Sequence, residues 1–79
     1  MKTTEEKTEA SAAEYRNLVA TLTALRIQKG LSQYELAKRA GVVHTTIARI
    51  EALEYQPLLS TFLSIAHALG CTVSIQAQE

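Results

Sequence analysis

The stretch QYELAKRAGVVHTTIARIEA, from Gln33 to Ala52, decides the fold. Its apolar residues recur at helical spacing on either side of Gly41, which indicates two very short helices joined by a tight turn. The inward positions are Leu36, Ala37, Ala40, Ile47 and Ile50. Gly41 can take a positive φ without a Cβ clash, and Val42 fills the corner. The pattern therefore predicts two short helices held at a steep angle.

The opposite face of the second of these helices, over 44–52, is expected to point into solvent. Its residues are His44, Thr45, Ala48, Arg49 and Ala52. This face is narrow, polar and free of bulky apolar side chains, which are the properties of a helix that enters the DNA major groove.

Further helices are predicted on both sides of this stretch. Ser11 and Glu14 form a capping-box pattern, which predicts a helix over about 12–29 that ends before Gly30. The apolar stripe of that helix is Tyr15, Leu18, Val19, Leu22 and Leu25. Ser32 and Glu35 form a second capping box at the start of the first short helix. After Pro57, residues 59–69 again show helical spacing, and Gly70 ends them.

Composition bounds the class of protein. The chain has 79 residues, enough for one core, and its 8 Lys and Arg balance its 8 Asp and Glu. Residues 1–10 are too polar to bury much and are predicted to be a flexible tail, residues 11–70 are predicted to form the helix-turn-helix domain, and residues 71–79 are predicted to form a C-terminal strand for dimerisation. A single cysteine, Cys71, fits a reducing compartment. No apolar run approaches a membrane span, so a cytoplasmic location is expected.

The ordered residues together resemble the phage-repressor (Cro/C1, or XRE) helix-turn-helix family. The resemblance covers about residues 16–70 and rests on Leu25-Arg26, Gly30-Leu31-Ser32-Gln33, Leu36-Ala37, Gly41-Val42, Thr46-Ile47, Arg49-Ile50-Glu51, Pro57, Ile65-Ala66 and Ala68-Leu69-Gly70. It implies an all-α, lambda-repressor-like bundle of four to five helices.

The resemblance also implies roles for individual side chains. Those expected to read base edges are His44, Thr45 and Arg49, and an arginine suits a bidentate contact with guanine. Those expected to contact phosphate are Ser32, Gln33 and Thr46. Arg26 and Glu51 are expected to form a structural ion pair that links the first helix to the end of the recognition helix.

Three positions depart from the family pattern. Val43 stands where a Ser or Thr usually caps the recognition helix, so that cap is expected to be missing. Leu53 stands where a Gly is common, which predicts that the recognition helix continues past residue 51. Leu58 replaces the usual capping Ser before the last helix.

Residues 71–77 alternate large apolar and polar side chains and predict a single β-strand. A lone strand leaves both edges unpaired, so the strand is expected to pair with that of a second copy across a twofold axis. Val73 and Ile75 would cover the helix junction in such a homodimer. The alternative is a frayed tail on a domain that dimerises through the last helix or does not dimerise.

The sequence therefore predicts a dimeric, sequence-specific repressor that occupies a palindromic operator in double-stranded DNA. Two alternatives remain open: an antitoxin that represses its own operon and also binds a protein toxin, and a protein-interaction module without DNA binding. An enzyme is not expected, because no nucleophile lies beside a base and there is no phosphate loop and no Asp. No cofactor, metal or membrane partner is expected.

Overall fold

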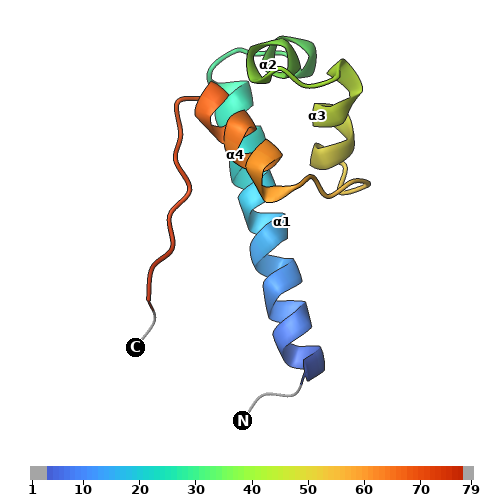
Figure 1. The fold of residues 1–79 in the computed structure, drawn as a ribbon, viewed down its shortest axis with the longest axis vertical. Helices are drawn as coiled ribbons and strands as arrows, with labels where there is room; N and C mark the ends of the chain where they lie inside the picture. Colours follow the sequence, from blue (N-terminus) through green and yellow to red (C-terminus); the bar gives the residue numbers. More distant parts are fainter. Residues whose placement is uncertain (1–3, 78–79) are drawn as a thin grey trace.

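The computed structural model describes the backbone of residues 4–77 and the side chains of residues 8–77. Four helices occupy this part of the chain: α1 (Thr4–Gln28), α2 (Gln33–Ala40), α3 (His44–Glu51) and α4 (Leu59–Ala68). Figure 1 shows α1 as one long rod, with the three short helices gathered around its C-terminal half. The N-terminal half of α1 projects beyond them, and the molecule measures 44 × 25 × 21 Å.

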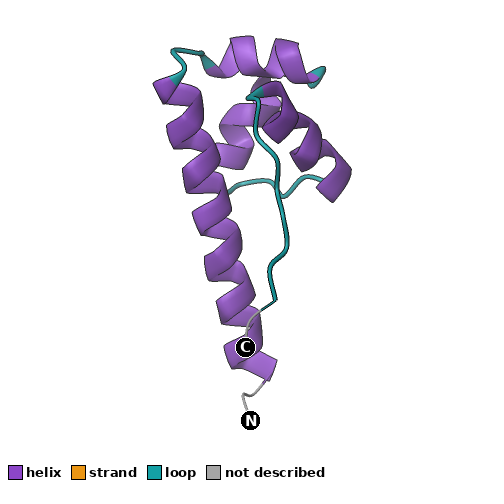
Figure 2. Ribbon diagram, turned by 90° about the vertical axis from the view of Figure 1, so that its left-hand side faces the viewer, coloured by secondary structure: helices purple, strands orange, loops and turns teal. Residues whose placement is uncertain are grey.

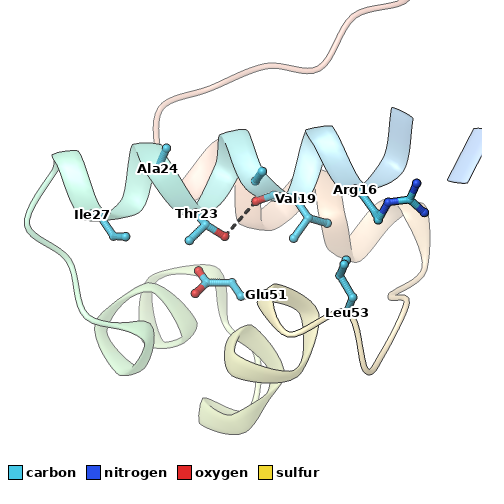
Figure 3. A pocket seen from close by; sticks show the side chains of 8 residues that line it. Arg16, Val19, Thr23, Ala24, Ile27, Glu51 and Leu53 are labelled. Carbon is cyan, nitrogen blue, oxygen red and sulfur yellow. Dashed lines mark hydrogen bonds between the residues drawn. The ribbon is translucent and has the colours of Figure 1, made fainter. Parts of the chain in front are cut away.

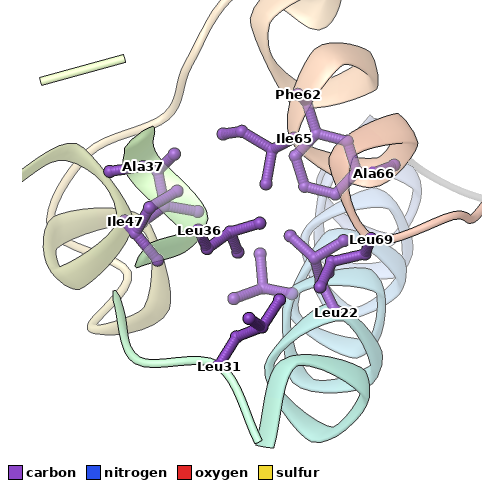
Figure 4. Packing of buried hydrophobic residues seen from close by; sticks show 11 residues of the cluster. Leu22, Leu31, Leu36, Ala37, Ile47, Phe62, Ile65, Ala66 and Leu69 are labelled. Atoms are coloured by element: carbon purple, nitrogen blue, oxygen red, sulfur yellow. The ribbon is translucent and has the colours of Figure 1, made fainter. Parts of the chain in front are cut away.

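The core lies where the short helices close on the second half of α1. Its buried residues are Val19, Leu22, Leu31, Leu36, Ala37, Ile47, Ile50, Phe62, Ile65, Ala66 and Leu69. Figure 4 shows side chains from all of these segments meeting in one cluster. The predicted inward positions of the two short helices are confirmed, except that Ala40 is only half-buried. In the stripe on α1, Leu18 differs from the prediction because 38% of its surface remains exposed.

Helix α1 begins at Thr4, so the prediction of a helix start near residue 12 is wrong, and residues 4–10 of the predicted tail are helical. Ser11 and Glu14 lie inside the helix and do not cap it. Nucleation is the costly step, and a helix anchored by its packed second half extends readily through good helix formers. Residues 4–13 are rich in Glu, Lys and Ala, so they need no burial to join it. Residues 1–3 lie outside the described part.

All four described helices end in the same hydrogen-bonded turn. The N–H two residues past the cap bonds to a carbonyl in the last turn of the helix, as in Leu31 to Arg26 (3.1 Å) and Cys71 to Ala66 (2.9 Å). The residue that turns left-handed is a glycine in three cases: Gly30, Gly41 and Gly70. This is the Schellman motif, which satisfies carbonyl groups that the helix end leaves without partners.

In the fourth case, the left-handed residue is Leu53, with φ of 61°. Its N–H bonds to the carbonyl of Ile50 and that of Glu54 to the carbonyl of Arg49, both at 2.9 Å. Helix α3 therefore ends at Glu51, and the prediction that it continues past residue 51 is wrong. A leucine in this conformation is strained, but the two hydrogen bonds still close the helix.

Residues 71–77 form no strand, so the predicted β-strand is absent from the described part of this single chain. Figure 2 shows the segment as an extended loop that follows α4. Alternating side chains specify extended backbone, but a strand also needs a neighbour for its N–H and C=O groups. Ile75 is 99% exposed and covers nothing in this chain, whereas Val73 is 37% exposed and borders grooves lined by α1 and α4. Residues 78–79 lie outside the described part.

Candidate nucleic-acid interface

Helix α3 presents two faces of opposite character. Ile47 and Ile50 are each 1% exposed and hold the helix against the core. His44, Thr45 and Arg49 are exposed, while Thr46 and Ala48 are half-buried at the edges. An α-helix with its side chains is about 10 to 12 Å across, which matches the width of about 12 Å of the major groove. The three residues predicted to read bases therefore share one accessible face.

The start of α3 has no side-chain cap. Val43 has the extended backbone of an N-cap residue (φ −63°, ψ 140°), but no side chain bonds to the first turn. The Val43 carbonyl accepts from the N–H of Thr46 at 2.9 Å. The absence of a side-chain cap, expected from Val43, is thus confirmed. It leaves backbone N–H groups without a side-chain partner at the N-terminus of α3, where His44 and Thr45 project.

The start of α2 is closed by a capping box, in which Ser32 and Glu35 each accept a hydrogen bond from the backbone N–H of the other. Ser32 Oγ accepts from the N–H of Glu35, and Glu35 Oε1 accepts from the N–H of Ser32, both at 3.0 Å. The hydrogen bond from the Ser32 N–H, together with the Ser32 side chain, favours the ionised carboxylate and lowers the pKa of Glu35. The Ser32 hydroxyl accepts the Glu35 N–H and also lies close enough to the Glu35 carboxylate to contribute to the lowered pKa. A hydroxyl carries one donor hydrogen and two acceptor lone pairs, so Ser32 has the chemistry for a phosphate contact.

Gln33, predicted only as a phosphate contact, is also part of the structural framework. It is half-buried, and its Nε2 donates to Glu51 Oε1 at 2.8 Å. An amide nitrogen carries two hydrogens, so one remains for a phosphate. Nothing local in the sequence indicates this contact, because the two residues lie 18 positions apart and meet only when α2 and α3 pack.

Arg26 and Glu51 form the ion pair that the resemblance implied. Arg26 Nε donates to Glu51 Oε2 at 2.7 Å and Nη2 donates to Oε1 at 2.9 Å, while Nη1 donates to the carbonyl of Leu31 at 2.8 Å. The two side chains are only 12% and 9% exposed. The Arg26–Glu51 pair therefore ties the end of α1, the turn before α2 and the last residue of α3 together.

The charge state of this network follows from its hydrogen bonds. Burial alone would raise the pKa of Glu51, but the hydrogen bonds from Arg26 and Gln33 outweigh it and lower the pKa below its ordinary value. The hydrogen bond to Glu51 raises the pKa of Arg26. Both groups are therefore charged over the physiological range, and the network holds α3 by charge-assisted hydrogen bonds.

Glu51 also borders a groove between α1 and the end of α3. The groove has a volume of about 360 Å³, and Figure 3 shows Glu51 and Leu53 facing α1 across it. The α1 residues on the opposite side are Arg16, Val19, Ala20, Thr23, Ala24 and Ile27. None of His44, Thr45 and Arg49 borders this groove. All three are exposed, so the described part of the chain does not cover that face of α3.

These features define a class of protein. Two short helices, joined by a glycine turn, present one solvent-facing helix whose polar side chains can enter a groove of DNA. That is the arrangement of helix-turn-helix DNA-binding proteins.

Comparison with known proteins places the chain within this class. A family model described as Helix-turn-helix (HTH_3) matches residues 22–76, and the chain belongs to this family, which includes the Cro/C1-type regulators. The family consists of DNA-binding regulators and not of enzymes, as the sequence predicted. No helix in residues 4–77 is long and apolar enough to span a bilayer.

Two curated relatives and one solved structure illustrate the family. The chain is 45% identical over 64 residues to antitoxin HigA1 of Mycobacterium tuberculosis, which covers 81% of this chain and 43% of that protein. It is 40% identical over 53 residues to the immunity repressor protein of Bacillus phage phi105, which covers 67% of this chain and 37% of the repressor. A chain in the structure of a HipA-HipB-O2-O3 complex matches with a TM-score of 0.74 and 28% identity, covering 82% of this chain and 92% of that one. The chain thus spans about two fifths of the length of these two curated relatives.

Proposed function

We propose that this protein is a sequence-specific repressor that binds operator DNA as a homodimer and blocks transcription by occupancy. The observation that carries the proposal is the exposed face of α3, where His44, Thr45 and Arg49 stand clear of the core. Arg49 is the principal base-reading residue, since a guanidinium can donate two parallel hydrogen bonds to guanine O6 and N7.

The contacts to the DNA backbone come from the helix starts. Ser32 offers a hydroxyl and Gln33 a second amide hydrogen, and both residues lie at the beginning of α2. Thr46 is the third expected phosphate contact and lies half-buried in the first turn of α3. These contacts orient the protein on the duplex and carry no sequence information.

The test compares Arg49→Ala with Ser32→Ala on cognate and random duplexes. Selection from a random duplex pool first supplies the cognate sequence. We expect Arg49→Ala to weaken cognate binding by about 1 to 3 kcal/mol and to relax selectivity at one base pair. Ser32→Ala should weaken cognate and random DNA to a similar extent. Equal losses on both duplexes for Arg49→Ala would contradict the assignment of base readout to Arg49.

The second part of the proposal is dimerisation through the C-terminal segment. Residues 71–77 are extended and lie across α1 and α4 from α3 in Figure 1, so an interface there leaves the recognition helix accessible. Beside Val73 lies a mostly apolar groove of about 470 Å³, bordered by the N-terminal part of α1 and by Gln56, Pro57 and Leu59. In it, the buried hydroxyl of Tyr15 has no hydrogen-bond partner in the described part of the chain. A second copy would cover these apolar groups and could satisfy that hydroxyl.

In this dimer, the C-terminal segments pair as a two-stranded antiparallel ribbon, with Val73 and Ile75 on the covered face. Two recognition helices would then lie about 34 to 36 Å apart and require a palindromic operator. Light scattering should show a dimer for the natural chain and a monomer for Ile75→Glu. Ser74→Glu adds the same charge on the other face and should remain dimeric. A dimer that persists in Ile75→Glu, and after deletion of residues 72–79, would refute the ribbon.

A second candidate function is that of an antitoxin, favoured by the match to HigA1 along 81% of this chain. The same dimer would repress its own operon and bind a protein toxin. Co-purification with the product of the adjacent reading frame, and rescue of cells from that product, separates this function from repression alone. A mobility shift on the protein's own upstream DNA at several salt concentrations tests both against an interaction module without DNA binding, which would give no sequence-dependent shift.

A further inference from the structure

The first side chain of the recognition helix lacks the usual support. His44 opens α3, the preceding Val43 provides no side-chain cap, and His44 itself is exposed. An exposed side chain at an uncapped helix start samples several rotamers, and ordering them on binding weakens both affinity and selectivity. Selective reading by His44 therefore needs a contact that holds the imidazole in place before DNA binds.

Tyr34 supplies such a contact. Its ring centroid lies 6.2 Å from that of His44, with the two planes tilted by 51°, which is a usual geometry for interacting aromatic rings. Tyr34 is 61% exposed, so it contributes little to the core. It is the second residue of α2, which is fixed by the Ser32 cap and by the fully buried Leu36. A rigid helix thus presents a ring to the start of α3.

The two rings also lie on a shared surface. Tyr34 and His44 border a groove of about 250 Å³ between α2 and the start of α3, together with Ala37, Lys38 and Val42. Lys38 follows Tyr34 by one helical turn, so a cationic side chain flanks the pair. The ring contact is therefore part of the surface that faces DNA if α3 enters the major groove.

We propose that Tyr34 is a positioning residue for base readout: its ring holds the His44 imidazole in one orientation, and so sets the selectivity at the base pair that His44 reads. This inference rests on the proposed function, since it requires α3 to enter the major groove. Tyr34 acts through His44, and its hydroxyl is not required.

The test is selection from a random duplex pool, performed separately with the natural protein, Tyr34→Ala, Tyr34→Phe, His44→Ala and the double variant Tyr34→Ala/His44→Ala. We expect His44→Ala and Tyr34→Ala to lose preference at the same base pair, with a threefold to tenfold loss of discrimination there. Tyr34→Phe keeps the ring and should select the same sequences as the natural protein. The double variant should lose no more discrimination than His44→Ala. Thermal unfolding of each variant checks that the fold is retained.

Several outcomes would overturn the proposal. If Tyr34→Phe loses affinity as Tyr34→Ala does, the hydroxyl contacts DNA directly. A uniform loss on all sequences for Tyr34→Ala would mean that the ring contributes only to backbone binding. Unchanged selection by Tyr34→Ala, while the natural protein selects a defined sequence, would refute the inference and leave the proposed function intact. If the natural protein selects no sequence at all, both fail together.

Discussion

The carboxylate of Glu51 is the group whose removal should destabilise the recognition helix most. Glu51→Ala deletes both hydrogen bonds that Glu51 accepts from Arg26 and the one it accepts from Gln33. Arg26 keeps only its bond to the carbonyl of Leu31, within a site where its side chain is 12% exposed.

The magnitude follows from these contacts. A hydrogen bond to a charged group contributes about 1.5 to 3 kcal/mol, and loss of one partner of a dry ion pair costs about 3 to 5 kcal/mol. Water can reach Arg26 in part, so we expect Glu51→Ala to lower the free energy of unfolding by about 3 kcal/mol. Arg26→Ala should have a similar effect, and the double variant should cost about 2 kcal/mol less than the sum of the two.

Urea denaturation at a fixed protein concentration measures these values. Glu54→Ala is the matched control, because Glu54 is an exposed acidic residue three positions further along and should change the stability by less than about 0.5 kcal/mol. A loss below about 1 kcal/mol for Glu51→Ala, or strict additivity with Arg26→Ala, would refute the view that this pair holds α3 in place.

Three further predictions concern the same region. The lowered pKa of Glu51 means that its stabilisation is complete above the unfolded-state value of about 4.3 and is lost as pH falls through the lower folded-state value. Glu51→Gln should therefore flatten the decline in stability between about pH 5 and 3 as followed by circular dichroism, and an unchanged acid slope would argue against it. Val43→Ser should cap α3 and raise stability by about 0.5 to 2 kcal/mol, with Val43→Ala as a control that gains nothing. Leu53→Gly should be more stable than Leu53→Ala by about 1 kcal/mol in urea denaturation, because φ is 61° there, and the opposite order would contradict the left-handed conformation.

Residue patterns alone predicted α2, the turn at Gly41 and the buried face of α3. Capping at Ser32, the left-handed turn at Gly41 and the buried Ile47 and Ile50 all depend on local periodicity and cap chemistry, which a single sequence reveals. The end of α3 at Leu53 was missed, because its closing motif was completed without the glycine that marks such a turn. Local rules are reliable where each position has its usual residue type.

Long-range features were harder to predict. The bond from Gln33 to Glu51 joins two helices, and no local pattern indicates it. The start of α1 does not follow from burial, because a helix with one packed half extends through exposed residues. The extended segment 71–77 shows a further limit: alternation specifies a conformation and does not supply a neighbouring strand. The base-reading roles of His44, Thr45 and Arg49 remain predictions.

The continuous rod of α1 combines two regimes of local stability. Its second half carries the buried Val19 and Leu22, whereas residues 8–12 are all exposed. Backbone amides near the buried residues should exchange with solvent deuterium only when the whole domain opens, while those toward the N-terminus should exchange through repeated fraying. One helix would thus show a gradient of protection from exchange along its length. A macromolecule that bound the N-terminal half of α1 would slow amide exchange there without altering it in the rest of the helix.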